Sequence, residues 1–281
     1  MRALLDSTRA ELLRLRRWPA VWVVVGAWLT LGLMFGYAFS YIGYRTGSGP
    51  AAEDRTRQQL LTSVLPPGVP DVLVQGMPMF GAALAMVLGA LAAGNGFGWG
   101  TWKTAFTQGP SRRRVIGGSL VAVSAFVVGI VVLTLVLFLG VATGIAAVVG
   151  RSLAGPDLAD VAPAFGGGLL VLEMWTLLGY AVAVVARGPA LAIGLGLVWV
   201  LVVENLLRSV ASLLPAIDQL TRVLPGTAGG SLVGAIIGGN PNGTPGVLAT
   251  VGGGRALLTV ASYVVALVVL VLAVMRRRDV A

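Results

Sequence analysis

The residues that most suggest chemistry form a glycine-rich run that ends in Lys103 and Thr104. A phosphate-binding loop has a glycine directly before its lysine and a second glycine five residues earlier. In this chain those two positions hold Trp102 and Phe97, and Lys103 is the only lysine. The spacing therefore predicts that this chain does not hydrolyse nucleotides itself.

Other catalytic and metal-binding chemistry is restricted by composition, because the chain has no cysteine and no histidine. These absences exclude disulfides, zinc sites built on Cys or His, haem ligation by histidine and acid–base catalysis by histidine. Paired acidic motifs are also missing from the sequence. We predict no catalytic residues, no metal site and no cofactor, and we do not expect an enzyme.

Two acidic residues lie within or beside apolar runs. Glu173 stands inside one, and a carboxylate buried in a bilayer is costly and marks a functional site by default. It could contact a cationic substrate group, cap a neighbouring backbone, or remain protonated in a water-filled cleft. Glu204 precedes Arg208 by four residues, which is the spacing of a local ion pair on a helix, so a structural role is favoured there.

The elements that carry these residues are apolar helices. The chain has 281 residues, of which 57% are hydrophobic and 11% are charged, whereas soluble domains carry about 25% charged residues. A helix needs about 20 mainly apolar residues to cross a bilayer, and six segments meet this condition. The pattern predicts an all-α membrane protein with six transmembrane helices. The expected spans are 19–42, 77–96, 117–149, 162–186, 189–205 and 256–275.

Residues 1–18 are expected to form an amphipathic helix that lies in the membrane interface, with its apolar face toward the acyl chains. The alternative is a frayed basic tail. The residues that fall within one arc at helical spacing are Leu4, Leu5, Thr8, Leu12 and Leu15.

The segment 206–254 is semi-polar and rich in Gly and Pro. Its apolar pieces are too short to span, so we expect an extracytoplasmic region with re-entrant or interfacial parts.

Basic clusters predict the topology. Arg112–Arg114 follow the second span, Arg276–Arg278 close the last, and the N-terminal stretch is basic. Such clusters mark loop ends that stay in the cytoplasm, so both termini are expected inside. The net charge is +9, but the cations sit beside apolar runs and are typical of topology signals and lipid contacts. We do not expect nucleic acid as a partner.

The loop 97–116 has a distinctive pattern between the second and third spans. It reads Gly100-Thr101-Trp102-Lys103, then a small polar turn, then Ser111-Arg112. This resembles the first cytoplasmic loop of ABC-2 type transporter permeases. The amphipathic N-terminal segment, the six spans and the proline of Leu224-Pro225 before the last span are similar too. Many members carry Glu shortly before the Gly-Thr pair, whereas this chain has Asn95, Gly96 and Gly98 there.

The resemblance implies the membrane-spanning subunit of an ATP-driven exporter in a bacterial cytoplasmic membrane. Two permease copies, identical or related, would enclose a path for an amphipathic compound. Two copies of a separate ATPase would drive them, and lipids would contact the spans. A short helix near 101–107, entered at Gly100 and ended by Gly109-Pro110, would dock on the ATPase. The residues expected to couple the two subunits are Gly100, Thr101, Trp102, Lys103, Ser111 and Arg112.

Other functions stay open at this point. One alternative is an ATP-independent channel or secondary carrier, for which more intramembrane charge than Glu173 is expected. Another is a non-transporting scaffold or immunity subunit, which the sequence does not dismiss.

Overall fold

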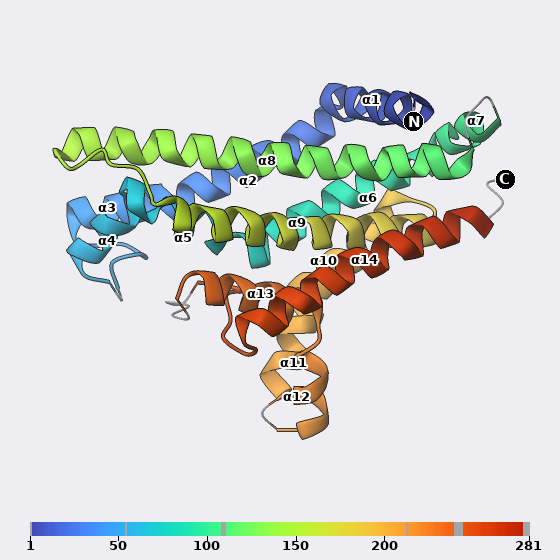
Figure 1. Ribbon diagram of the computed structural model, residues 1–281. Helices are drawn as coiled ribbons and strands as arrows, with labels where there is room; N and C mark the ends of the chain where they lie inside the picture. The colour runs from blue at the N-terminus through green and yellow to red at the C-terminus, as the bar shows by residue number, and fades with distance from the viewer. Residues whose placement is uncertain (1, 54, 108–110, 212, 239–243, 278–281) are drawn as a thin grey trace.

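The computed structural model describes residues 2–53, 55–107, 111–211, 213–238 and 244–277. Over these ranges the chain is helical and has no strand (Figure 1). Six helical stretches are long and apolar enough to cross a membrane, which confirms the predicted all-α, six-span membrane protein. They are Pro19–Thr46, Pro66–Gly98, Arg112–Val149, Leu158–Ala186, Pro189–Ala211 and Gly253–Arg276.

Several of these stretches are built from more than one helical segment. The first contains α2 (Pro19–Leu33), η1 (Met34–Ala38) and α3 (Phe39–Thr46); the second contains η2 (Pro66–Gly68), α5 (Val69–Gln75), η3 (Met77–Gly81) and α6 (Ala82–Gly98). The third is α8 (Arg112–Val149), the fourth is α9 (Leu158–Ala186), and the fifth contains α10 (Pro189–Val198), η4 (Trp199–Val203) and α11 (Glu204–Ala211). The sixth is α14 (Gly253–Arg277). The segments η1, η3 and η4 are π-helical turns, and η2 is a 3₁₀ turn.

The spans extend beyond the expected boundaries. The second begins at Pro66 rather than at 77, because Pro66, Pro70 and Pro78 each stand in the first turn of a helical segment, where proline is tolerated. The third helix includes Arg112 and the two arginines that follow. With 38 residues, α8 is about 57 Å long by helical rise, so it projects beyond a hydrocarbon core of about 30 Å.

The helices α6 and α9 form the centre of the bundle. Their apolar windows are 61% buried, against 17–33% for the first, third, fifth and sixth spans. Glycines bring their backbones together: a Cβ atom on Gly89 would lie 1.8 Å from the carbonyl oxygen of Thr176, and one on Gly179 would lie 2.0 Å from that of Met86. The second span therefore packs inside the bundle at Gly89, where a small residue lets the backbones approach.

The first helix, α1 (Arg2–Arg17), packs across the start of α8 (Figure 1). Leu15 is 1% exposed, and Ser7 Oγ donates a hydrogen bond to the carbonyl oxygen of Val115. A Cβ atom on Gly118 would lie 2.6 Å from that of Ser7, so glycine opens the groove in which α1 lies. Part of the apolar arc packs on α8, where Leu4 lies against Gly117, whereas Leu5 is 52% exposed; that this helix lies in the membrane interface stays a prediction.

The segment 206–254 contains the end of α11, then α12 (Pro215–Thr221) and α13 (Pro225–Ile236). Residues 212 and 239–243 lie outside the described residues. The helix α13 has 12 residues, too few to cross a bilayer, and it packs against α9, α14 and the second span. Much of it is buried. Gly230 allows the backbone at Gly246 to approach closely, and Gly234 does so for the backbone at Leu248. This part of the segment is thus a short helix embedded in the bundle.

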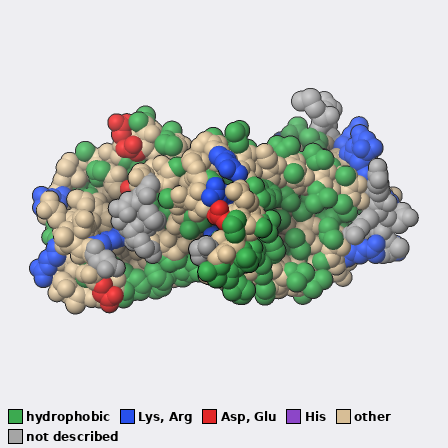
Figure 2. Space-filling model, turned by 90° about the horizontal axis from the view of Figure 1, so that it is seen from below, with side chains coloured by type: hydrophobic (Ala, Val, Ile, Leu, Met, Phe, Trp, Pro, Cys, Tyr) green, Lys and Arg blue, Asp and Glu red, His purple; other side chains and the backbone are tan. Residues whose placement is uncertain are grey.

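The two ends of the bundle differ in charge. Figure 1 places α1, α7 (Thr101–Thr107) and the C-terminal end of α14 together, and we call this the basic end. Figure 2 shows Lys and Arg side chains gathered there, and mixed Lys/Arg and Asp/Glu side chains at the opposite end. Between the two ends, hydrophobic side chains lie beside a small group of Lys/Arg and Asp/Glu side chains. We call that opposite end, which carries α3 and α4 (Arg57–Val64), the distal end. The hydrophobic side chains of this face match the six apolar spans.

The glycine contact yields a first prediction. Gly89→Ala should lower the thermal stability of the detergent-purified protein by about 1–3 kcal/mol, because the added methyl group collides with backbone that cannot move aside. Gly129→Ala on α8 is the control, since nothing lies within 4 Å of a Cβ atom there. Thermal unfolding of both variants measures the difference, and equal midpoints would contradict the close packing of α6 and α9.

Candidate coupling site and intramembrane carboxylates

The loop that resembles a coupling loop folds as expected at its centre. The short helix predicted near 101–107 is present as α7, and it begins directly after Gly100. Gly100 has φ +65°, a conformation that glycine adopts without strain, so it allows the chain to turn sharply after α6. Gly109 and Pro110, which were expected to end the helix, lie outside the described residues.

Trp102 anchors α7 to the end of α6. Its side chain is 2% exposed, and its Nε1 donates a hydrogen bond of 3.0 Å to the carbonyl oxygen of Ala93. The indole stacks on Phe106, with ring centroids 5.8 Å apart. A Cβ atom on Gly96 would lie 2.2 Å from Trp102 Nε1, so the glycine makes room for the ring. Trp102 therefore positions α7 and does not present itself to a partner.

The other residues of the predicted coupling set lie around this anchor. Thr101, Lys103 and Ser111 are exposed at the basic end. Arg112 begins α8, and its guanidinium carbon lies 5.3 Å from the centre of the Phe106 ring, a cation–π contact that ties α7 to α8. The structure thus brings together Gly100, Thr101, Trp102, Lys103, Ser111 and Arg112. Thr101, Lys103 and Ser111 are exposed, whereas the other three residues hold α7 in place.

A second anchor, which sequence reasoning missed, joins α1 to the same end of α6. Arg14 Nη2 donates a hydrogen bond of 2.7 Å to the carbonyl oxygen of Ala92 and lies 2.8 Å from Glu11 Oε2. Burial raises the pKa of Glu11 above its ordinary value, while the neighbouring Arg14 opposes that shift. The sequence signal was the spacing of Glu11 and Arg14, three residues apart on one helix face.

Glu173 lies on α9, far along the chain from this cluster, and contacts α8. Ser124 Oγ donates a short hydrogen bond to Glu173 Oε1. The second carboxylate oxygen, Oε2, is buried and has no hydrogen-bond partner within the described part of the chain. The structure therefore identifies one neighbour of Glu173, a hydroxyl group, and does not join this residue to the coupling set.

Glu204 joins the fifth span to α13. The carboxylate is 1% exposed; its Oε1 accepts hydrogen bonds from Trp199 Nε1, at 2.8 Å, and from the backbone N–H of Gly226, at 3.1 Å. Gly226 lies in the first turn of α13, where unpaired N–H groups and the helix dipole favour a negative charge. Arg208 Nη1 lies 3.8 Å from Glu204 Oε2, which is the i,i+4 contact that the sequence spacing indicated.

The π-helical turn η4 makes this arrangement possible. Trp199 and Glu204 are five residues apart, and in a regular α-helix they would point in different directions. Hydrogen bonding from i to i+5 widens the turn and brings the two side chains together. Sequence reasoning missed the capping of α13, although Leu224-Pro225 carries the proline that often opens a helix.

In the described ranges, no group of three or more His, Cys, Asp or Glu side chains is placed to hold a metal ion. A scan against protein-family models finds no match for this chain, and a search of curated proteins finds none. The residues and their geometry therefore carry the functional argument.

The anchor of α7 can be tested with a lysine-specific protease, because Lys103 is the only lysine of the chain. Trp102→Ala should raise the rate of cleavage after Lys103 at least tenfold, since each loss of about 1.4 kcal/mol in local stability raises the open population tenfold. Trp102→Phe should have a smaller effect, because it keeps the stacking and loses the hydrogen bond to Ala93. The control is Trp99→Ala, at a position 66% exposed. An unchanged rate in Trp102→Ala would contradict the anchor.

The cap on α13 predicts a graded response at Glu204. Glu204→Ala should lower the free energy of unfolding by about 3 kcal/mol, since it leaves Arg208 and the N–H group of Gly226 without their buried partner. Glu204→Gln keeps an acceptor oxygen and should cost about 1 kcal/mol through the lost charge at the helix end. Asp218→Ala removes an ion pair with Arg222 whose members are more than 30% exposed, and it should cost less than about 1 kcal/mol. Thermal unfolding in lipid nanodiscs ranks the variants, and any other order would contradict the cap.

Proposed function

We propose that this chain is the membrane-spanning subunit of an ATP-driven exporter in a bacterial cytoplasmic membrane, energised by a separate ATPase subunit. The observation that carries the proposal is α7, a short helix fixed by a buried tryptophan that presents exposed polar and basic side chains at one end of a six-span bundle. The resemblance of the loop to that of ABC-2 type permeases supports the same function.

The orientation follows from charge. Cations gather at the basic end, and positively charged segments next to spans stay in the cytoplasm. With this end inside, both termini, α1 and α7 face the cytoplasm, where an ATPase would be found. Members of the exposed basic set are Arg9, Arg16, Arg17, Lys103, Arg113, Arg114 and Arg276.

Energy would pass to the bundle by contact. An ATPase that docks on Thr101, Lys103 and Ser111 would move α7, and Trp102 would carry the movement to α6. Two copies of the chain would enclose a path for an amphipathic compound, and two ATPase copies would close on ATP binding and switch that path from inward to outward opening. The chain itself would consume no nucleotide.

Charge reversal on α7 tests this function. Lys103→Glu, alone and together with Arg112→Glu, should weaken co-purification with the proposed ATPase subunit at least tenfold, and should abolish stimulation of its ATPase activity in vesicles. The physical reason is repulsion of the acidic groups that would meet these cations, because close interfacial charge pairs contribute more than about 1.5 kcal/mol. The single variant Lys103→Glu keeps the contact between Arg112 and Phe106, whereas the double variant loses it. A comparison of the two therefore shows how much of the effect comes from losing that contact.

The matched control reverses two exposed arginines at the distal end, Arg45→Glu with Arg151→Glu. It has the same change in net charge and should leave both readouts unaltered. If the α7 variants also bind and stimulate the ATPase as the unmodified chain does, α7 is not the coupling element.

A further inference from the structure

Glu173 lies near the middle of α9, within the membrane-spanning part. This helix has 29 residues, and each of its ends is about 20 Å from Glu173 by helical rise. A hydrocarbon core of about 30 Å covers most of such a helix, so it includes Glu173. A charged carboxylate at this depth is costly and needs partners that offset the loss of water.

Two side-chain hydrogen bonds join α9 to α8, which runs in the opposite direction (Figure 1). Toward the basic end, the Tyr180 hydroxyl donates to Ser119 Oγ at 3.0 Å. The second bond, farther from that end, joins Ser124 Oγ to Glu173 Oε1. The other carboxyl oxygen of Glu173, Oε2, is buried and has no hydrogen-bond partner among the described residues. Within that part of the chain, one hydroxyl group is therefore what this carboxyl group has as a polar partner.

Glu204, an acidic residue buried in the fifth span, shows what a charged carboxylate requires in this protein. Its Oε1 accepts hydrogen bonds from Trp199 Nε1 and from the N–H group of Gly226, and Arg208 Nη1 lies 3.8 Å from its Oε2. Two N–H donors and a guanidinium group thus offset the loss of water. Glu173 has a single hydroxyl group in their place, so burial favours its neutral form.

The helices that pack on α9 bring no cation to the level of Glu173. In α5, α6, α10 and α13, the one charged side chain is that of Asp71 on α5. The arginines of α8 end at Arg114, ten residues before Ser124, which is about 15 Å by helical rise. Arg255 and Arg276 lie near the two ends of α14. The remaining titratable side chains of α9 and α14 are Asp160, Tyr180 and Tyr263. Both tyrosine hydroxyl groups have other partners.

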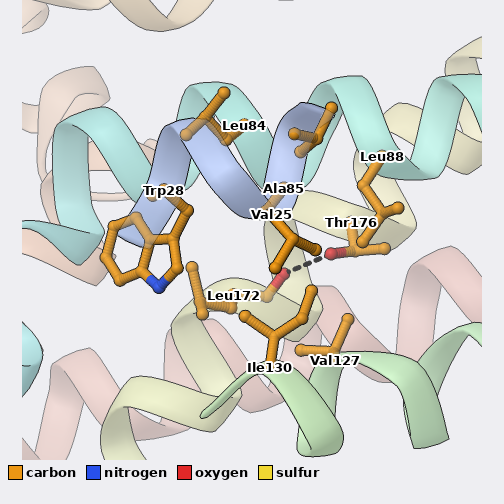
Figure 3. A pocket seen from close by; sticks show the side chains of 11 residues that line it. Val25, Trp28, Leu84, Ala85, Leu88, Val127, Ile130, Leu172 and Thr176 are labelled. Carbon is orange, nitrogen blue, oxygen red and sulfur yellow. Dashed lines mark hydrogen bonds between the residues drawn. The ribbon is translucent and has the colours of Figure 1, made fainter. Parts of the chain in front are cut away.

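The crevice between α2, α6, α8 and α9, shown in Figure 3, does not hydrate the Glu173 carboxyl group. Its lining on α9 is Leu172 and Thr176, and Glu173 is not part of it. The crevice has a volume of about 20 Å³, which is room for one water molecule at most. The Thr176 hydroxyl already donates to the carbonyl oxygen of Leu172 at 2.8 Å (Figure 3). The hydrogen bond to Ser124 therefore has to satisfy Glu173 without help from this crevice.

We propose that Glu173 is a neutral carboxylic acid in the folded bundle and forms a proton-binding site in the middle of the membrane. The hydrogen between the two oxygens then belongs to the carboxyl group, which donates to Ser124 Oγ. The serine hydroxyl can in turn donate to a backbone carbonyl group of its own helix. Oε2 becomes an uncharged carbonyl oxygen, for which a missing partner costs far less than for a charged one.

The bound proton keeps the contact between α8 and α9 free of charge, so one hydrogen bond can tie the two helices together in hydrocarbon. Loss of the proton would leave a charge with a single donor and would draw water between them. This site involves no nucleotide and no ATPase, so it stands or falls independently of the exporter function.

Infrared spectroscopy of the full chain in lipid nanodiscs at neutral pH tests the proposal. The unmodified chain should show a carbonyl stretching band of a protonated carboxyl group, and Glu173→Gln should remove it. Glu204→Gln should keep this band and should instead remove absorption of a carboxylate. If the band is missing from the unmodified chain, or if Glu173→Gln removes carboxylate absorption, Glu173 is charged and the proposal is wrong.

A matched pair of serine variants tests the hydrogen bond. Ser124→Ala should move the band to higher frequency, because the carboxyl group loses its partner. Ser119→Ala, which removes the partner of Tyr180 on the same two helices, should leave the band in place. A band that responds equally to both variants would contradict the contact between Glu173 and Ser124.

A second experiment needs no variant and decides the matter should Glu173→Gln fail to fold. A lipid-soluble carbodiimide reacts with protonated carboxyl groups: the acid adds across a C=N bond, and an acyl shift from oxygen to nitrogen leaves a stable N-acylurea. Mass spectrometry should find the added mass of one carbodiimide on Glu173 and none on Glu204. Absence of label from Glu173, or equal label on both residues, would overturn the assignment.

Discussion

The contact between α6 and α9 is the constraint on which the rest of the structure depends. In a bilayer, helices gain little from burying apolar side chains, so close packing and hydrogen bonds must hold them together. Gly89 and Gly179 allow backbone atoms of one helix to touch those of the other, and a methyl group at either position would collide. The helices α10, α13 and α14 all pack on this pair, so their positions follow from it.

Polar groups inside the spans follow a second constraint, because an unpaired polar atom in hydrocarbon is costly. Tyr180 on α9 donates to Ser119 Oγ on α8 at 3.0 Å, and the Trp28–Thr134 hydrogen bond joins α2 to α8. The Glu204 carboxylate likewise joins η4 to α13, because it accepts hydrogen bonds from Trp199 and from Gly226. Each pair links elements that are distant in the sequence, so the few polar residues of the spans also specify which helices are neighbours.

The sequence predicted what depends on local pattern. Six apolar segments and the short helix after Gly100 could be read from hydrophobicity and glycine position. The orientation of α1 could not, because its amphipathic arc suits a lipid surface and a helix groove equally, and the groove at Gly118 appears only in three dimensions. The start of the second span could not be predicted, because its prolines are typical of loops as well as of first helical turns. The cap of Glu204 on α13 requires a π-helical turn, which leaves no sequence periodicity to detect.

The two anchors at the basic end converge on neighbouring backbone atoms. Arg14 of α1 binds the carbonyl oxygen of Ala92, and Trp102 of α7 binds that of Ala93. Both carbonyl groups lie on α6, about one helical turn beyond Gly89, where α6 cannot slide against α9 without backbone collision. In the proposed exporter, a push on α7 or α1 would therefore reach the central pair through hydrogen bonds of 2.7 and 3.0 Å, and α6 and α9 would respond together. If α7 is the docking element, one rigid contact would then suffice, and α7 would need few exposed side chains.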